Sequence, residues 1–186
     1  MSRILLFIII LSIPSTVVYA VMSKMTIALT KAEVVSDQKY LNASVRISRF
    51  TTEPYFTFDM TFVVLQKLND LSLQVRHLVW LAGRENVFFD VTVDLCSFYK
   101  RPNHSILKLV FEEIKKHGPV PTSCPIFPKR FVYSNISLNK IRIPPYIPET
   151  RFQMVINAWT GSKQGNVVIY EGRWFGRLKK IVRSNE

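Results

Sequence analysis

Hydrophobic and polar residues alternate in short runs along most of this chain, and turn residues separate the runs. Two early runs, residues 26–35 and 40–47, are expected to form a first pair of strands. A third run, residues 56–62, alternates most cleanly and places these large side chains on one face: Phe56, Phe58, Met60 and Phe62. Short alternating segments repeated in this way are typical of an antiparallel sandwich or barrel. The pattern therefore predicts an all-β fold.

The same alternation continues through the rest of the chain, first in residues 71–76 and 87–95. The inward faces expected for these two segments are Leu71, Leu73 and Val75, and then Val87, Phe89, Val91, Val93 and Leu95. Residues 131–138 are strand-like as well. They lead into residues 143–148, where three prolines exclude a central strand and indicate an extended connector.

A closing hairpin is expected from residues 151–160 and 166–174, joined by the loop 161–165. The first of these strands turns Phe152, Met154, Ile156 and Ala158 inward. The second strand has two possible inward faces: Val168, Tyr170 and Trp174, or Val167 and Ile169. Periodicity alone leaves this choice open.

One short helix interrupts the β pattern. Apolar residues at helical spacing form a stripe made of Ile106, Leu107, Val110, Phe111 and Ile114. Asn103 or Ser105 is expected to cap its start, and Gly118 with Pro119 to end it. Such a stripe usually contacts a sheet. A membrane-surface helix is disfavoured because Glu112 and Glu113 stand among the lysines and the stripe is short.

The first twenty residues are typical of a secretory signal peptide. Arg3 precedes a ten-residue apolar run, and Ala20 offers a small residue at the cleavage position. The alternative is an uncleaved membrane anchor, for which the run is short. No later run is apolar enough to cross a bilayer, so residues 21–186 are expected to form one secreted, extracellular domain that does not span a membrane. Three Asn-x-Ser sequons, at Asn42, Asn103 and Asn135, are candidate glycosylation sites in such a protein.

The chain has two cysteines, Cys96 and Cys124. In an oxidising compartment they leave a single disulfide, which would clamp the helix-bearing segment and be worth roughly 3–4 kcal/mol by loop closure. Strict alternation places Cys96 on the outward face. Either the strand twists or bulges there, or the disulfide secures a segment that crosses the edge of the sheet.

The formal net charge is +12, or +11 once Arg3 is removed from that sum. The basic residues are spread out, ending in a basic C-terminal tail that contains Arg173, Arg177, Lys179, Lys180 and Arg183. Because no nucleic-acid-binding motif accompanies them, nucleic acid is not an expected partner. A solvated basic surface is the simplest interpretation.

Catalysis is not expected. The three histidines, His77, His104 and His117, lack the spaced carboxylate or cysteine ligands of a metal site. The sequence has no nucleophile elbow and no phosphate-binding glycine loop. We therefore expect no catalytic residues, no metal and no cofactor.

Several of these features together resemble a known family. The Phe89–Cys96 run, the helix, Cys124-Pro125, the Pro-rich connector and the closing hairpin are similar to those of secreted insect proteins of unknown function that include the CheB-like chemosensory proteins. That family is similar to the ML lipid-recognition fold. The resemblance implies an immunoglobulin-like β-sandwich whose sheets can part to hold a lipid, and it implies a chemosensory role for some members.

Two functions follow. In the first, the protein binds a lipid or other apolar small molecule in a cavity. The candidate lining residues are Phe56, Phe58, Met60, Phe62, Leu73, Val75, Phe89, Val91, Phe152, Met154 and Ile156. The same residues would equally fill a closed core. In the second, the protein is an accessory module that binds a receptor or channel ectodomain through an exposed face, such as the Tyr146 loop or the basic tail.

Overall fold

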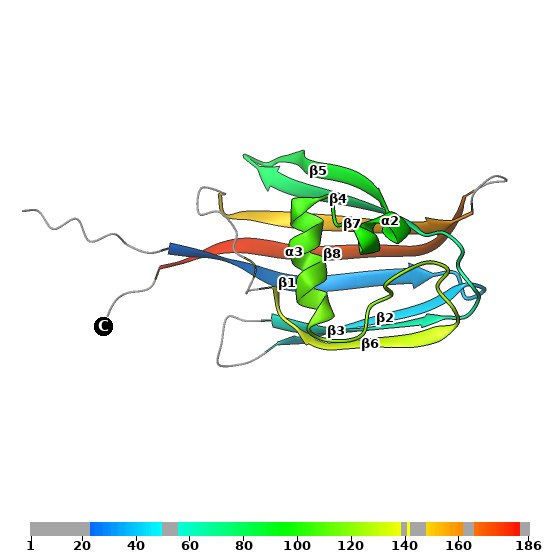
Figure 1. Ribbon diagram of the computed structural model, residues 1–186. Coiled ribbons are helices and arrows are strands. Elements are labelled where there is room, and N and C mark those ends of the chain that lie inside the picture. Colours follow the sequence, from blue (N-terminus) through cyan, green and yellow to red (C-terminus); the bar gives the residue numbers. More distant parts are fainter. Residues whose placement is uncertain (1–22, 50–55, 139–140, 142–147, 162–165, 183–186) are drawn as a thin grey trace, which may run out of the picture.

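The computed structural model describes residues 23–49, 56–138, 141, 148–161 and 166–182. Two antiparallel sheets face each other (Figure 1). The five-stranded sheet has the order β1-β8-β7-β4-β5, and the three-stranded sheet has the order β2-β3-β6. The strands are β1 (Ser23–Ser36), β2 (Leu41–Arg49), β3 (Phe56–Val64), β4 (Ser72–Leu81), β5 (Arg84–Asp94), β6 (Lys129–Ile136), β7 (Thr150–Thr160) and β8 (Val167–Val182). The predicted all-β sandwich is confirmed.

The first two strands do not pair with each other, contrary to the prediction. β1 pairs with β8, and β2 pairs with β3 in the opposite sheet. The turn at Asp37 explains the difference: its carbonyl accepts hydrogen bonds from the N–H groups of Tyr40 and Leu41, while its own N–H donates to Ile169 of β8. The chain therefore crosses from one sheet to the other at this point instead of folding back along β1.

Strand β8 continues well beyond the predicted end of the hairpin. Arg173, Arg177 and Lys179 belong to this strand and alternate with the buried Trp174 and Leu178, so the segment is not a basic tail. The inward position between them is Gly176. A side chain there would collide with the Phe152 ring and the Ala28 carbonyl, so the strand passes close to both.

A register shift settles which face of β8 points inward. Ala158 pairs with Tyr170, whereas the next residue, Trp159, pairs with Val168. Ile169 is the additional residue of this bulge, and both Ile169 and Tyr170 are buried. Each of the two predicted faces was therefore correct for part of the strand.

The segment between the cysteines holds two helices, not one. α2 spans Leu95–Lys100 and α3 spans Ser105–Lys115. The carboxylate of Asp94 accepts a hydrogen bond from the Ser97 N–H at 3.0 Å and caps α2, so Cys96 lies in this helix. The cap of α3 is His104, which forms no side-chain capping bond, rather than Asn103 or Ser105.

The disulfide between Cys96 and Cys124 is confirmed, with 5.4 Å between the two Cα atoms. It joins the start of α2 to the segment that follows α3. This segment is fastened in turn to the connection between β3 and β4, because Ile126 and Leu68 exchange backbone hydrogen bonds of 2.8 and 2.9 Å. Both ends of the helical excursion are thus tied to the sandwich.

The hairpin of β4 and β5 extends the sheet further than predicted. Ala82 and Gly83 form its turn with positive φ angles of 50° and 78°, as a tight two-residue hairpin turn requires. A register shift between His77 and Leu78 changes the facing of β5. For this reason Val87, predicted to point inward, is 60% exposed.

None of the helices in the described ranges has the length and apolar character needed to cross a membrane. The expected signal peptide, residues 1–20, lies outside the described residues, as do Tyr146 and Arg183.

Candidate ligand-binding cavity

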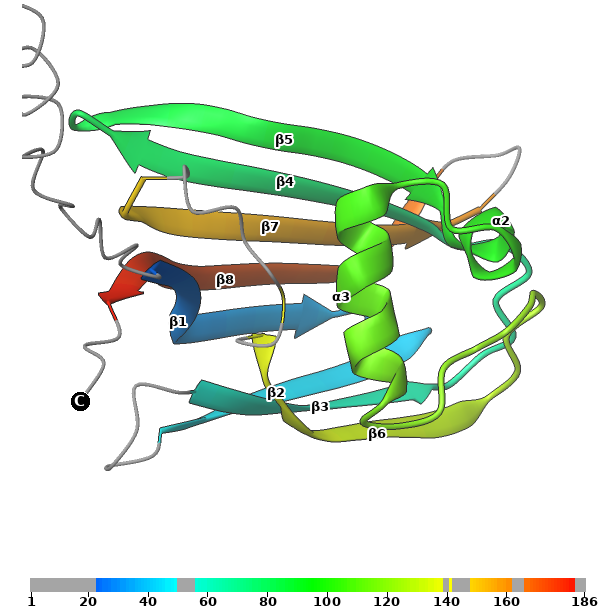
Figure 2. The same cartoon turned by 60° about the vertical axis from the view of Figure 1, so that its left-hand side comes forward.

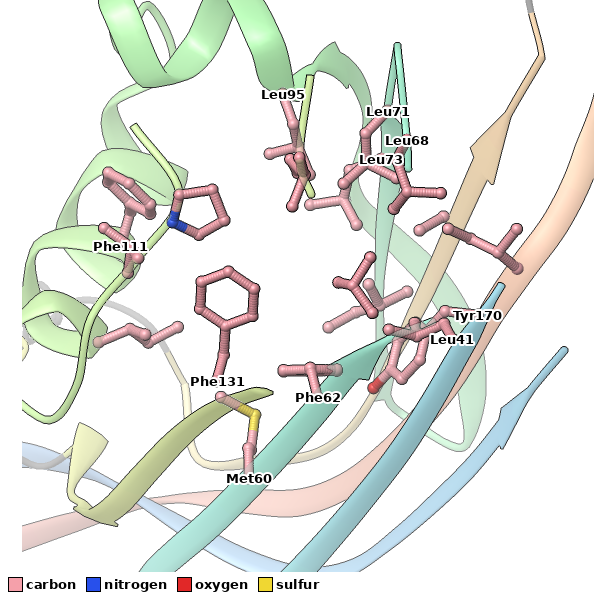
Figure 3. Close-up of a pocket in the computed structure, with 18 of the residues that line it drawn as sticks. Leu41, Met60, Phe62, Leu68, Leu71, Leu73, Leu95, Phe111, Phe131 and Tyr170 are labelled. Carbon is pink, nitrogen blue, oxygen red and sulfur yellow. The ribbon is translucent and has the colours of Figure 1, made fainter. Parts of the chain in front are cut away.

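A cavity of about 260 Å³, partly open to solvent, lies between the two sheets at one end of the sandwich. Figure 3 shows Met60 and Phe62 of β3 facing a common space, with Leu73 of β4 and Leu71, just before that strand, across from them. The remaining wall residues from the strands and their connections are Leu41, Val64, Leu68, Ile126, Phe131, Tyr133, Ile156, Ala158, Ile169, Tyr170 and Trp174. Nearly all of these side chains are apolar, so the cavity suits an apolar guest.

The two helices and the chain after them cover the open side of this cavity. Figure 2 shows α3 lying across the strands from β5 toward β6, beside the gap between the sheets. The helices and the segment that follows contribute Leu95, Tyr99, Phe111, Ile114, Val120 and Pro121 to the lining. Tyr99 stacks on Phe111 with their ring centroids 5.6 Å apart, and Phe98 meets the same ring edge-on at 5.5 Å. The two helices therefore pack as one cover.

The C-terminal end of α3 is fastened to β6 by a buried polar cluster. Glu113 is only 3% exposed. Its carboxylate accepts a hydrogen bond from Lys116 at 2.7 Å and faces Nε2 of His117 at 3.3 Å. Nδ1 of His117 lies 2.9 Å from the Ser134 carbonyl oxygen on β6. The imidazole of His117 therefore links the Glu113 carboxylate of α3 to the backbone of β6.

Four of the predicted lining residues border the cavity: Met60, Phe62, Leu73 and Ile156. The other seven do not: Phe56, Phe58, Val75, Phe89, Val91, Phe152 and Met154. Among the latter, Phe58, Val75 and Phe152 are buried, so the face was predicted correctly for them. These three residues lie at other positions along their strands, beyond the end of the cavity. On β3 the cavity begins after Phe58, and on β7 it begins after Met154.

The other end of the interior is closed by packed aromatic rings. Phe58 of β3 meets Trp174 of β8 edge-on at 5.1 Å, which joins the two sheets. On the five-stranded sheet, the His77 ring stacks between Phe89 and Phe152, with centroid distances of 5.2 Å to each. We call this half of the interior, around Phe58 and His77, the packed half, and the half around Met60 and Ile156 the cavity half.

Burial in the packed half changes the pKa of His77. Burial lowers the pKa of this imidazole from 6.5 to about 4, because the charged form loses its hydration. Its Nδ1 atom has no hydrogen-bond partner among the described residues. His77 is therefore a neutral part of an aromatic stack at physiological pH.

Three phenols line the cavity half. Burial raises the pKa of Tyr133 and of Tyr170 to about 12, and burial together with the nearby Tyr133 raises the pKa of Tyr99 as well. All three hydroxyls are thus neutral at physiological pH. They can donate or accept hydrogen bonds but cannot balance a charge.

Some of the lining residues that the prediction missed carry a partial signal in the sequence. Phe111 and Ile114 belong to the helical stripe that was expected to contact a sheet, and Leu71 and Ala158 to predicted inward faces. Val120, Pro121 and Ile126 lie in irregular chain without periodicity, so no pattern marked them.

The three sequon asparagines are all exposed in the structure. Asn42 lies on β2, Asn103 between the helices, and Asn135 near the end of β6 with a positive φ of 62°. Within the described ranges, His, Cys, Asp and Glu side chains do not gather in groups that could hold a metal ion.

The fold and cavity define the class as a small antiparallel β-sandwich with a helix-covered apolar cavity. Residues 70–154 match a family described as protein of unknown function (DUF1091). The matched range contains β4, β5, both helices, both cysteines and β6, and it ends within β7. It therefore holds the cover of the cavity, whereas β2, β3 and β8 lie outside it. No curated protein matches this chain.

Proposed function

We propose that this protein is a secreted binding protein that carries a lipid or other apolar small molecule in the cavity between its sheets. The observation that supports the proposal most strongly is the cavity itself, with its volume of about 260 Å³ and its nearly uniform apolar lining. Pockets for small molecules are usually somewhat larger, at roughly 300–1,000 Å³, and are built in this way from apolar walls with few polar groups. The resemblance to secreted insect chemosensory proteins supports a chemosensory role for this binding.

Secretion is part of the same proposal. The disulfide fits an extracellular protein, since such bonds persist in oxidising compartments. We expect the secreted protein to begin at Val21. Mass-spectrometric sequencing of the N-terminus tests this expectation. A product that retains residues 1–20 and fractionates with membranes would refute it.

Two substitutions on one strand test whether the cavity binds a ligand. Ile156 lines the cavity, whereas its neighbour Val155 points to the opposite face of β7, between Arg76 and Arg173 of the adjacent strands. Ile156→Trp should fill the cavity and reduce binding of the neutral fluorescent probe 1-aminoanthracene at least tenfold. Val155→Trp, the matched control, should bind the probe as the wild type does. Equal binding by both variants would place the probe elsewhere.

Native mass spectrometry of the protein secreted from cultured insect cells tests occupancy directly. Apolar adducts that co-purify with wild type and are lost in Ile156→Trp support the proposal. An empty wild-type protein that also fails to bind the probe would overturn it.

The second candidate function is an accessory module that binds a receptor or channel ectodomain. The observation that favours it is the outer edge of the five-stranded sheet, where Val87 and Phe88 of β5 are exposed together with Leu81 at the end of β4. An empty protein in the experiment above would favour this function. Loss of receptor-ectodomain binding in Phe88→Ser would then support it.

A further inference from the structure

We infer that the cavity selects an uncharged molecule with an alkyl chain of about ten carbons and one hydroxyl, carbonyl or ester group near the Tyr99–Tyr133 phenols. This inference rests on the proposed function and makes it more specific in three respects, namely size, charge and the position of the polar group.

The size follows from the cavity volume. A water-sized group occupies about 30 Å³ in a liquid, so a cavity of about 260 Å³ holds roughly nine such groups. A methylene group is of similar size. A chain of about ten carbons would therefore fill the space. The remainder of a longer chain would extend through the opening into water, where it would add little binding free energy.

The charge follows from the residues of the wall. No lining residue in the described part of the chain is charged. An ionised carboxylate moved into such a wall would lose its hydration without meeting a cation, and this is costly. Two lysines lie over lining rings, with Lys115 Nζ 5.8 Å from the Phe111 centroid and Lys129 Nζ 5.7 Å from the Phe131 centroid. Both lysines are exposed, and Lys115 already pairs with Glu112, so their ammonium groups remain in water.

The polar group follows from two hydroxyls. Tyr133 is only 4% exposed, and Tyr99 and Tyr133 both line the cavity. Neither hydroxyl forms a hydrogen bond with another described residue. A phenol both donates and accepts, so the pair suits an alcohol, a carbonyl or an ester. Tyr170 differs, because its hydroxyl lies directly against Gly172 of its own strand.

A homologous series measures the size. Isothermal titration calorimetry of the full secreted protein at pH 7.5, with primary alcohols from 1-hexanol to 1-tetradecanol, should show affinity rising about fourfold per added methylene, equivalent to about 0.8 kcal/mol. The rise should stop near ten carbons. A rise that continues to 1-tetradecanol would overturn the size assignment.

A matched pair of ligands measures the charge. Decanoate is almost fully ionised at pH 7.5, since carboxyl groups have pKa values of roughly 4–5. We expect it to bind at least about a hundredfold more weakly than 1-decanol. Equal affinities for the two ligands would overturn the preference for uncharged ligands. A loss of decanoate binding in Lys129→Ala would then identify Lys129 as the cation that pairs with the carboxylate.

Three single-oxygen deletions locate the polar group. Tyr99→Phe and Tyr133→Phe keep the ring packing and should each weaken 1-decanol binding about three- to tenfold, the usual value of one hydrogen bond. The affinity for decane, which has no polar group, should not change. Tyr40→Phe is the matched control, because Tyr40 lies outside the cavity wall, and it should bind both ligands as the wild type does. An unchanged affinity for 1-decanol in both test variants would overturn the phenol assignment.

The same measurements separate this inference from the proposed function. If alcohols and 1-aminoanthracene all fail to bind, the carrier function itself is wrong. If they bind without preference for length, charge or the two phenols, the carrier function stands and this inference fails.

Discussion

The two halves of the interior are built from the same strands, but one half is filled by side chains and the other contains a cavity. On β3, Phe58 packs edge-on against Trp174, whereas Phe62, four residues later on the same face, borders the cavity. On β7, Phe152 stacks on His77, whereas Ile156 borders the cavity. The alternation along each strand is uniform across this boundary. What changes is the layer opposite: a ring fills the space at one end, and the helical cover bridges it at the other.

The largest difference between the two halves should appear when a phenylalanine is removed from each. Phe58→Ala leaves a void in a closed core and should lower the free energy of unfolding by about 3–5 kcal/mol. Phe62→Ala enlarges a space that is already open and should cost about half as much, while weakening probe binding. Chemical denaturation of both variants measures the difference. Equal losses would show that both halves are packed alike.

Breaking the disulfide tests the cover of the cavity half. Cys96→Ala releases α2 from the segment before β6 and should cost about 2–5 kcal/mol while impairing secretion. Because the released elements form the cover, binding of 1-aminoanthracene should weaken as well. Denaturation and probe titration of the secreted variant measure the two effects. A variant with full probe affinity would show that the cover does not depend on the disulfide.

A smaller effect, in the packed half, depends on pH. His77 has a folded-state pKa of about 4 against 6.5 when exposed, so the unfolded chain binds the proton more readily. The stability from its burial is therefore complete above pH 6.5 and is lost as the pH falls toward 4. Between pH 7.5 and 4.5 the loss should be about 1–2 kcal/mol, after allowance for the partial exposure of the ring.

The substitution His77→Phe isolates this contribution. It keeps an aromatic ring in the stack, so the variant should lose about 1–2 kcal/mol less than the wild type over the same pH range. Urea denaturation at both pH values provides the comparison. Identical losses in the two proteins would show that His77 is hydrated in the folded state.

The sequence indicated which side chains point inward better than it indicated which of them border the cavity. Alternation identified Phe58, Met60 and Phe62 as one inward set, because side chains in a strand change face at every residue. It carried no information on which of them meet a partner ring across the interior. That depends on how α3 and the segment 119–126 lie over the strands, and these elements are placed by the disulfide and by the Glu113–His117 cluster.

Strand pairing was predicted less well than strand identity. β1 and β2 are adjacent in the sequence and were expected to pair, but the Asp37 turn sends them to different sheets. Bulges at Ile169 and at Phe88 also shifted the facing of β8 and β5, since one additional residue reverses the alternation beyond it. Such shifts are set by contacts between distant strands, which no local pattern records.

The pairing of β1 with β8 has a consequence for the order in which the protein folds. Of the described strands, β1 is made first and β8 last, and the hydroxyl of Thr26 donates to the carbonyl of Lys179, 153 residues away. During synthesis β1 therefore has no pairing partner until β8 has been made. Contacts of such long range slow folding and leave strand edges open to other chains. The newly made chain is accordingly most prone to aggregate before the sixteen residues of β8 have been made.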